Sequence, residues 1–151
     1  MAITRFFLAS MVVLAFLGTA SADLEDHKPE DNTVKRIQAM IYCRRNGELI
    51  KTEGATARVS CFVDVKVKPF TVISPPTKGG YFYMDLEKLV PFRYNIKKDC
   101  KVYLNEPAST PGDCTIPTND NDGIDGASLD KPPRKLNEDT SLLSVGPFVY
   151  V

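Results

Sequence analysis

Residues 54–63 of this 151-residue chain, GATARVSCFV, decide the fold. Small and apolar residues occupy every second position, and Thr56, Arg58, Ser60 and Phe62 lie between them. This period of two is typical of a strand with one buried face. A cysteine falls on the inward face, so this strand can be cross-linked to the core as well as packed against it. The residues predicted to point inward are Ala55, Ala57, Val59, Cys61 and Val63.

Other short segments with strand character surround this one. Residues 34–43 carry apolar side chains at every second position, and the Asn-Gly pair at 46–47 is a strong turn signal. No window has sustained apolar spacing of three and four residues, so almost no helix is expected. The sequence predicts an all-β fold, a small antiparallel β-sandwich or barrel of about six to seven strands. Further strands are expected within residues 66–74, 81–86, 89–96, 100–104 and 146–151.

Residues 1–22 have the pattern of a secretory signal peptide, with a lone Arg5, an apolar run and the small residues Ala20-Ser21-Ala22. The apolar run is shorter than the roughly 20 residues that span a bilayer, so we expect cleavage before Asp23, export, and no membrane partner afterwards. Residues 23–33 follow as an acidic, flexible leader. Residues 34–151 form the β domain, whose net charge of about +3 is far short of a nucleic-acid-binding surface.

Four cysteines lie in the β domain: Cys43, Cys61, Cys100 and Cys114. An even number in an exported chain predicts two disulfides, and four cysteines allow three pairings. A zinc site is disfavoured because Cys-x-x-Cys spacing is absent and the only histidine, His27, lies in the leader.

No catalytic or metal-binding constellation is apparent. Nucleophilic catalysis needs a base beside the nucleophile, and the acidic residues of the β domain are scattered over turns rather than paired across a cleft. The run NDNDGIDG at 119–126 does not fit a calcium loop, because a start at Asn121 puts Gly123 at position three and Pro132 at position twelve. We expect a plain turn there, and no enzyme activity, metal or cofactor.

Aromatic and basic residues are the candidates for ligand binding. Tyrosine rings offer flat apolar surfaces to sugar rings, and Lys and Arg can pair with uronic acids. The alternative is that the rings belong to the core and the cations to a solvated face. The candidate glycan contacts are Arg44, Arg45, Tyr81, Tyr83, Tyr94, Lys97, Lys98, Lys101 and Tyr103.

Short motifs also follow one another in a distinctive order. They are IYC at 41–43, GA at 54–55 ahead of VSC at 59–61, GGYF at 79–82, CKVYL at 100–104, CTIPTN at 114–119 and GPF at 146–148. This ordered set resembles the plant pollen-allergen (olive type) and extensin-like family. It is also similar to the cysteine-containing domain of plant proline-rich and arabinogalactan proteins, over roughly residues 36–151.

The resemblance implies a secreted, non-enzymatic protein of the plant cell wall or apoplast that interacts with wall polysaccharide of the pectin or galactan class, acidic in character. Many family members carry six cysteines. The four-cysteine form resembles the phylloplanins, which implies an alternative role in defence against microbes at the leaf surface. If one family bridge is deleted, the remaining pairs are implied to be Cys43–Cys114 and Cys61–Cys100.

Overall fold

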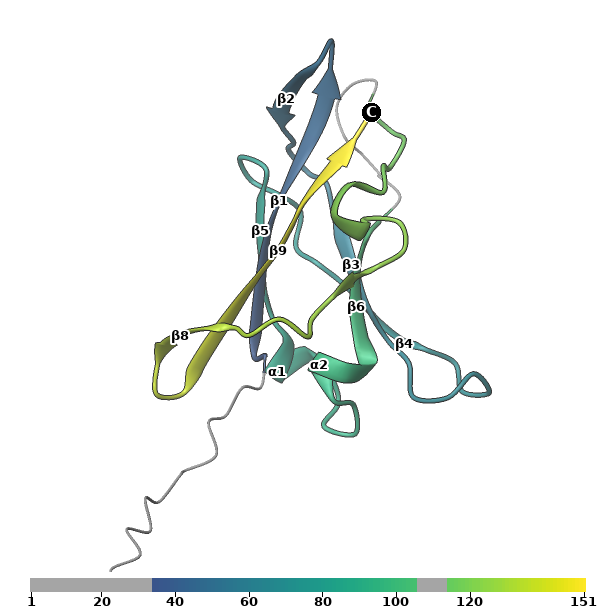
Figure 1. Cartoon of the computed structure of the whole chain (residues 1–151), viewed down its shortest axis with the longest axis vertical. Helices are drawn as coiled ribbons and strands as arrows, with labels where there is room; N and C mark the ends of the chain where they lie inside the picture. The colour runs from purple at the N-terminus through teal and green to yellow at the C-terminus, as the bar shows by residue number, and fades with distance from the viewer. Residues whose placement is uncertain (1–33, 106–113) are drawn as a thin grey trace, which may run out of the picture. The chain divides into compact units, whose positions relative to one another are not determined.

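Two β-sheets lie on opposite sides of one apolar core in the computed structural model, which describes residues 34–105 and 114–151 (Figure 1). The predicted signal peptide and leader, residues 1–33, lie outside the described residues. The first sheet contains β1 (Arg36–Arg45), β2 (Glu48–Lys51), β5 (Tyr81–Asp85), β8 (Arg134–Asn137) and β9 (Thr140–Tyr150). The second contains β3 (Ala57–Cys61), β4 (Phe70–Ile73), β6 (Cys100–Leu104) and β7 (Ala127–Ser128).

The all-β prediction is therefore confirmed, as a two-sheet arrangement and not as a closed barrel. The strands assigned in the described residues number nine, more than the six to seven expected. Several of the additional strands are short or wholly exposed and carry no alternating pattern, as in the ELIK of β2 and the RKLN of β8.

Strand β1 is the centre of the first sheet. β9 pairs with one edge of β1. On the other edge, β5 pairs with residues 36–40 and β2 pairs with residues 42–45. The alternation predicted for β1 is confirmed, because Ile37, Ala39, Ile41 and Cys43 are all buried. The pairing with β9 is parallel, so this sheet is mixed. A parallel neighbour needs a long crossover, and the chain provides one by passing through the second sheet before it returns.

Strand β3 confirms the alternation predicted for residues 54–63, except at the end of that stretch. Ala57, Val59 and Cys61 are buried as predicted, but Val63 is exposed because the strand stops at Cys61. The backbone N–H of Phe62 donates to the carbonyl of Asp99 at 2.8 Å, after which the chain leaves the sheet.

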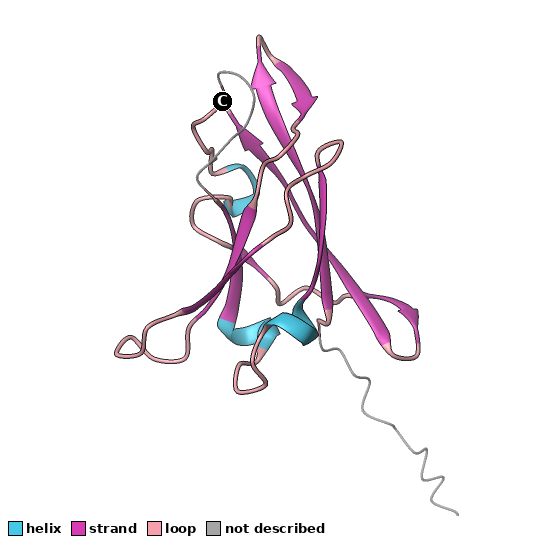
Figure 2. Cartoon of the chain, turned by 180° about the vertical axis from the view of Figure 1, so that it is seen from behind, coloured by secondary structure: helices cyan, strands magenta, loops and turns pink. Residues whose placement is uncertain are grey.

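The strand expected within residues 89–96 is wrong. Helix α1 (Leu86–Leu89) ends at the first residue of this region, and helix α2 (Ile96–Asp99) begins at its last (Figure 2). Each helix is one turn long, and a turn separates them. Asp85 and Asn95 cap them, since the side-chain oxygen of each accepts from the backbone N–H three residues later. A short 3₁₀ turn, η1 (Asp120–Asp122), completes the helical structure of the described residues.

The two disulfides are Cys43–Cys114 and Cys61–Cys100, which confirms the pairing implied by the family resemblance. Cys61 and Cys100 are direct partners across β3 and β6, with Cα atoms 4.0 Å apart, so this bond fastens two strands of one sheet. Cys43 lies near the end of β1, and its bond fixes the segment that leads to η1.

Tyr150 also connects the two layers. It lies near the end of β9, its side chain is completely buried, and its hydroxyl donates to the carbonyl of Asn105, which follows β6. Burial raises the pKa of the Tyr150 phenol from 10.0 to about 12.

Candidate functional site

The outward side of the first sheet carries a continuous set of aromatic and uncharged polar side chains. Cross-strand register places Tyr83 of β5 opposite Gln38 of β1, and Gln38 opposite Ser144 of β9. Tyr81 lies opposite Met40 in the next row. We call this surface the tyrosine face and define it as Gln38, Met40, Tyr42, Tyr81, Tyr83, Ser144 and Pro147. A shallow hollow of ≈ 450 Å³ is lined by all of these except Tyr83.

A chain of hydrogen bonds orients the polar groups of the tyrosine face. The Tyr81 hydroxyl donates to Gln38 Oε1 at 3.1 Å, and Gln38 Nε2 donates to Ser144 Oγ at 2.7 Å. This arrangement fixes which end of the amide faces each neighbour and leaves the Ser144 hydroxyl hydrogen free to donate to a ligand. The rings of Tyr81 and Tyr83 remain 42% and 40% exposed, so both present apolar surface beside these polar groups.

The turn before β5 places Tyr81 on this face. Gly80 has φ +78°, its N–H donates to the carbonyl of Thr52, and its carbonyl accepts from Ile41 N–H at 2.7 Å. A Cβ on Gly80 would lie 3.0 Å from the Ile41 oxygen, so the close approach of this turn to β1 favours glycine. The buried hydroxyl of Thr77 supports the turn, because it donates to the Thr52 carbonyl and accepts from Ala55 N–H, both at 3.0 Å.

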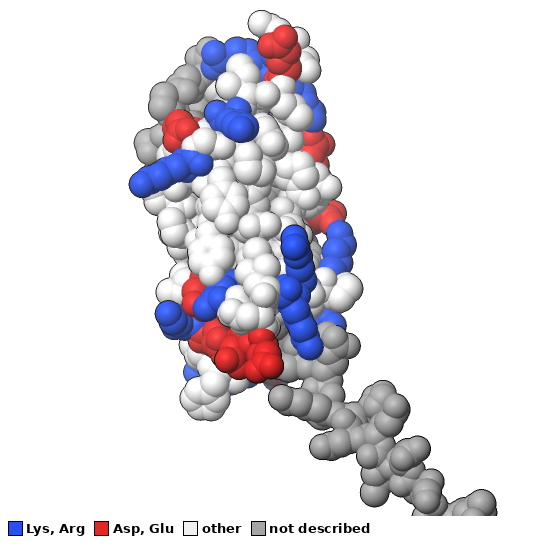
Figure 3. Space-filling view, turned by 90° about the vertical axis from the view of Figure 1, so that its left-hand side faces the viewer, with Lys and Arg blue, Asp and Glu red and all other residues white. Residues whose placement is uncertain are grey.

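Charged groups lie toward the two ends and along one edge of this side of the molecule, around an uncharged central area (Figure 3). At one end Arg36 contacts Asp85 at 3.4 Å and donates to the Thr140 hydroxyl at 2.9 Å. At the other end Lys51 lies opposite Tyr42 in the β1–β2 pairing. The middle of the tyrosine face is therefore suited to a neutral ligand.

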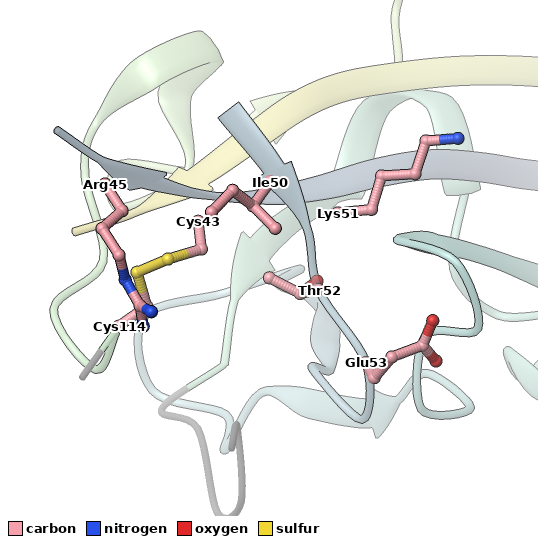
Figure 4. Close-up of a pocket in the computed structure, with 7 residues that line it drawn as sticks. All are labelled: Cys43, Arg45, Ile50, Lys51, Thr52, Glu53 and Cys114. Carbon is pink, nitrogen blue, oxygen red and sulfur yellow. A yellow bond between two sulfur atoms is a disulfide. The ribbon is translucent and has the colours of Figure 1, made fainter. Parts of the chain in front are cut away.

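The predicted glycan contacts do not form a single site. Tyr81 and Tyr83 lie together on the tyrosine face, but Arg44 pairs with Asp120 at the β1–β2 hairpin. Arg45 lines a separate hollow of ≈ 270 Å³ beside the Cys43–Cys114 disulfide (Figure 4).

The remaining candidates lie on or near the second sheet. Tyr94 is 7% exposed and packs against Phe70, with ring centroids 5.8 Å apart, so it belongs to the core and is out of reach of a ligand. Tyr103 lies beneath the Arg58 guanidinium, 4.9 Å from the ring centroid. The three lysines are outside the tyrosine face: Lys97 and Lys98 are on α2, and Lys101 is on β6.

Sequence reasoning missed Gln38 and Ser144. Alternation along residues 34–43 already puts Gln38 on the outward face, but its proximity to Ser144 depends on the parallel pairing of β1 with β9. Two strands separated by about a hundred residues carry no local signal that they are neighbours.

The 119–126 segment is a tightly bonded turn. Asn119 Oδ1 accepts from the backbone N–H groups of Ile124 and Asp125, both at 3.0 Å, and Asn119 Nδ2 donates to the Asp125 carboxylate. Within residues 34–105 and 114–151, no cluster of three His, Cys, Asp or Glu side chains is positioned to hold a metal ion. The same residues include no helix long and apolar enough to cross a membrane.

The chain is similar in sequence to one plant protein and aligns in structure with another. It is 29% identical over 163 residues, covering 99% of this chain and 96% of the relative, to a protein of Arabidopsis thaliana named Seed and Root Hair Protective Protein. The crystal structure of the major plantain pollen allergen Pla l 1 aligns with a TM-score of 0.46 at 16% identity, over 77% of this chain and 91% of that one. No family model matches the chain.

Proposed function

We propose that the protein is secreted by a plant cell and binds polysaccharide of the extracellular wall through the tyrosine face. Similarity along nearly the whole chain to a plant protein named for the protection of seeds and root hairs supports a role at the plant surface. The two disulfides fit an oxidising, extracellular location.

The observation that carries the binding proposal is the hydrogen-bonded chain Tyr81–Gln38–Ser144 beside two exposed tyrosine rings. A pyranose ring has an apolar face that packs on an aromatic ring and hydroxyls at its rim that need hydrogen-bond partners. The tyrosine face supplies both kinds of group side by side, on strands rather than on mobile loops. Tyr42 and Pro147 extend the same surface along the hollow.

Within the pectin and galactan class, we propose neutral galactan segments as the ligand of this face. The residues that line the hollow include no Lys or Arg to meet a uronic acid carboxylate. An acidic pectin chain would instead need the lysines of α2 and β6, which lie on other parts of the surface.

We further propose that the protein acts by binding and not by catalysis. The residues that line the hollow include no Asp, Glu, His or Cys, so the hollow offers neither the carboxylate pair of a glycosidase nor a nucleophile with its base.

Binding of the secreted protein to immobilised galactan and to homogalacturonan, each at low and high salt, tests this proposal. We expect galactan binding that persists at about 1 M salt, where the Debye length is only about 3 Å. The variant Lys97→Ala/Lys98→Ala/Lys101→Ala should retain it. Binding that favours homogalacturonan and is abolished by salt or by this triple variant would assign recognition to the cations instead. Inhibition of spore germination without binding to either polysaccharide would favour the phylloplanin-like defence role.

A further inference from the structure

Two loops of the described structure expose apolar side chains to solvent. In the β3–β4 loop, residues 62–69, Val65 is completely exposed, and Phe62, Val63 and Val67 are about half exposed or more. In the loop between α1 and α2, residues 90–95, Phe92 is completely exposed. We call these two loops together the apolar end.

The two loops emerge from the same end of the domain and rest on a common base (Figures 1 and 2). The Cys61–Cys100 disulfide joins the strand that precedes the first loop to the strand that follows α2. The Phe62 N–H donates to the Asp99 carbonyl at 2.8 Å, and the Phe70 and Tyr94 rings pack together at 5.8 Å. The bases of the two loops are therefore joined, and both tips project from the same end of the domain (Figure 1).

The apolar end also carries a concentration of positive charge. The two loops and the adjoining helix α2, residues 62–69 and 90–99, contain five basic residues and two acidic ones, a net charge of +3, equal to that of residues 34–151 as a whole. In the described structure none of the five cations has a carboxylate partner, and the Asp64 and Asp99 carboxylates accept from nearby backbone N–H groups. The basic residues are Lys66, Lys68, Arg93, Lys97 and Lys98.

We propose that the apolar end docks on the surface of a lipid bilayer that contains anionic lipids. Phe92 and Val65 would insert among the headgroups and upper acyl chains, while the surrounding cations would pair with lipid phosphates and carboxylates. Apolar side chains flanked by Lys and Arg are the combination that binds proteins to membrane interfaces. The proposal departs from the expectation that the mature chain has no membrane partner, and it does not depend on the tyrosine face.

The apolar side chains favour a lipid partner over an acidic polysaccharide. A polyuronate would engage the lysines but would leave a phenylalanine and several valines in water. A contiguous patch of exposed apolar side chains, unlike scattered single ones, marks an interaction surface. A bilayer accepts both components, because its headgroup layer is charged and the layer below it is apolar.

The chain contains no tryptophan, which allows a direct test with the secreted protein. Phe92→Trp and Val65→Trp each introduce a single fluorophore, and Leu49→Trp on the exposed β2 strand, at the opposite end of the domain (Figure 1), is the matched control. With phosphatidylcholine vesicles containing phosphatidylserine, we expect a blue shift of emission at positions 92 and 65 and none at position 49. No shift at 92 and 65, or an equal shift at all three positions, would overturn the proposal.

Vesicle co-sedimentation tests the two components separately. Phe92→Ser/Val65→Ser should weaken binding at least about tenfold, because the inserted apolar surface is lost. Lys66→Gln/Lys68→Gln should weaken it by about fivefold for each cation removed, and only on anionic vesicles. The control Leu49→Ser/Ile124→Ser, which alters exposed apolar residues away from the apolar end, should bind as the unaltered protein does. Absence of vesicle binding by the unaltered protein, or binding to polyuronate that the Phe92→Ser/Val65→Ser change does not weaken, would contradict a lipid partner.

Discussion

The buried hydroxyl of Tyr150 predicts a stability difference that reverses sign with pH. The phenol lies completely inside the core, where burial raises its pKa from 10.0 to about 12. Because the folded protein holds this pKa above that of the unfolded chain, the stabilisation is fully present below about pH 10 and is lost as the pH rises through 12. The variant Tyr150→Phe lacks the ionisable group and therefore isolates its contribution.

The expected magnitude follows from two opposing terms. At about pH 8, Tyr150→Phe should be less stable by about 1 kcal/mol, because the Asn105 carbonyl loses its hydrogen bond. Between about pH 10 and 12, the shift from 10.0 to about 12 should cost the unaltered protein about 3 kcal/mol, at about 1.4 kcal/mol per pKa unit. The two stability curves should then cross near pH 11, above which the variant is the more stable protein.

Urea unfolding of both proteins across this pH range measures the difference directly, and the extrapolated free energies are compared at each pH. Ultraviolet absorbance of tyrosinate gives an independent measurement, because subtracting the titration of the variant isolates Tyr150. A constant separation of the two stability curves from about pH 8 to 12 would refute the reasoning and would mean that the hydroxyl is not held away from water.

Three further predictions concern the scaffold and its processing. Cys61→Ser/Cys100→Ser, which opens a disulfide with a sequence separation of 39, should lower the free energy of unfolding by roughly 4 kcal/mol in urea denaturation, and a loss below about 1 kcal/mol would contradict this estimate. Thr77→Val should cost about 1–3 kcal/mol, because the buried Ala55 N–H loses its acceptor while the Thr52 carbonyl keeps the Gly80 N–H, whereas the exposed control Thr115→Val should change little; equal effects would argue against the buried network. Amino-terminal sequencing of the secreted protein should begin at Asp23 with Asp-Leu-Glu-Asp, and an intact amino terminus would show that the segment is retained.

Local patterning was enough to predict the individual strands with one buried face. Alternation identified the buried side of β1 and most of β3, because each of these strands has one face on the core. Alternation failed at residues 89–96, where the structure has the ends of one-turn helices capped by Asp85 and Asn95. A helix of four residues is too short to produce a periodic apolar pattern. Alternation also failed for β2 and β8, whose side chains are exposed on both faces.

The candidate site was predictable only in part. Tyr81 and Tyr83 were named because tyrosine rings can stack on sugar rings, and their alternate positions in β5 put both on one exposed face. Their polar neighbours come from β1 and β9, and the parallel pairing that joins those strands leaves no trace in the local sequence. Tyr94 was predicted to be a surface contact, but it is buried in the core. Its residue type is equally consistent with either position.

The most direct test of the proposed function is isothermal titration of soluble galactan oligosaccharides into the variant Tyr81→Ala/Tyr83→Ala. Ile73→Ala/Leu136→Ala, at exposed apolar positions outside the tyrosine face, is the matched control, and urea unfolding verifies that both variants remain folded. Loss of both rings should weaken binding at least about tenfold while the control binds normally, because the stacking surface disappears and Gln38 loses the donor that orients it. Unchanged galactan affinity in the folded Tyr81→Ala/Tyr83→Ala variant would contradict the assignment of the tyrosine face as the binding site.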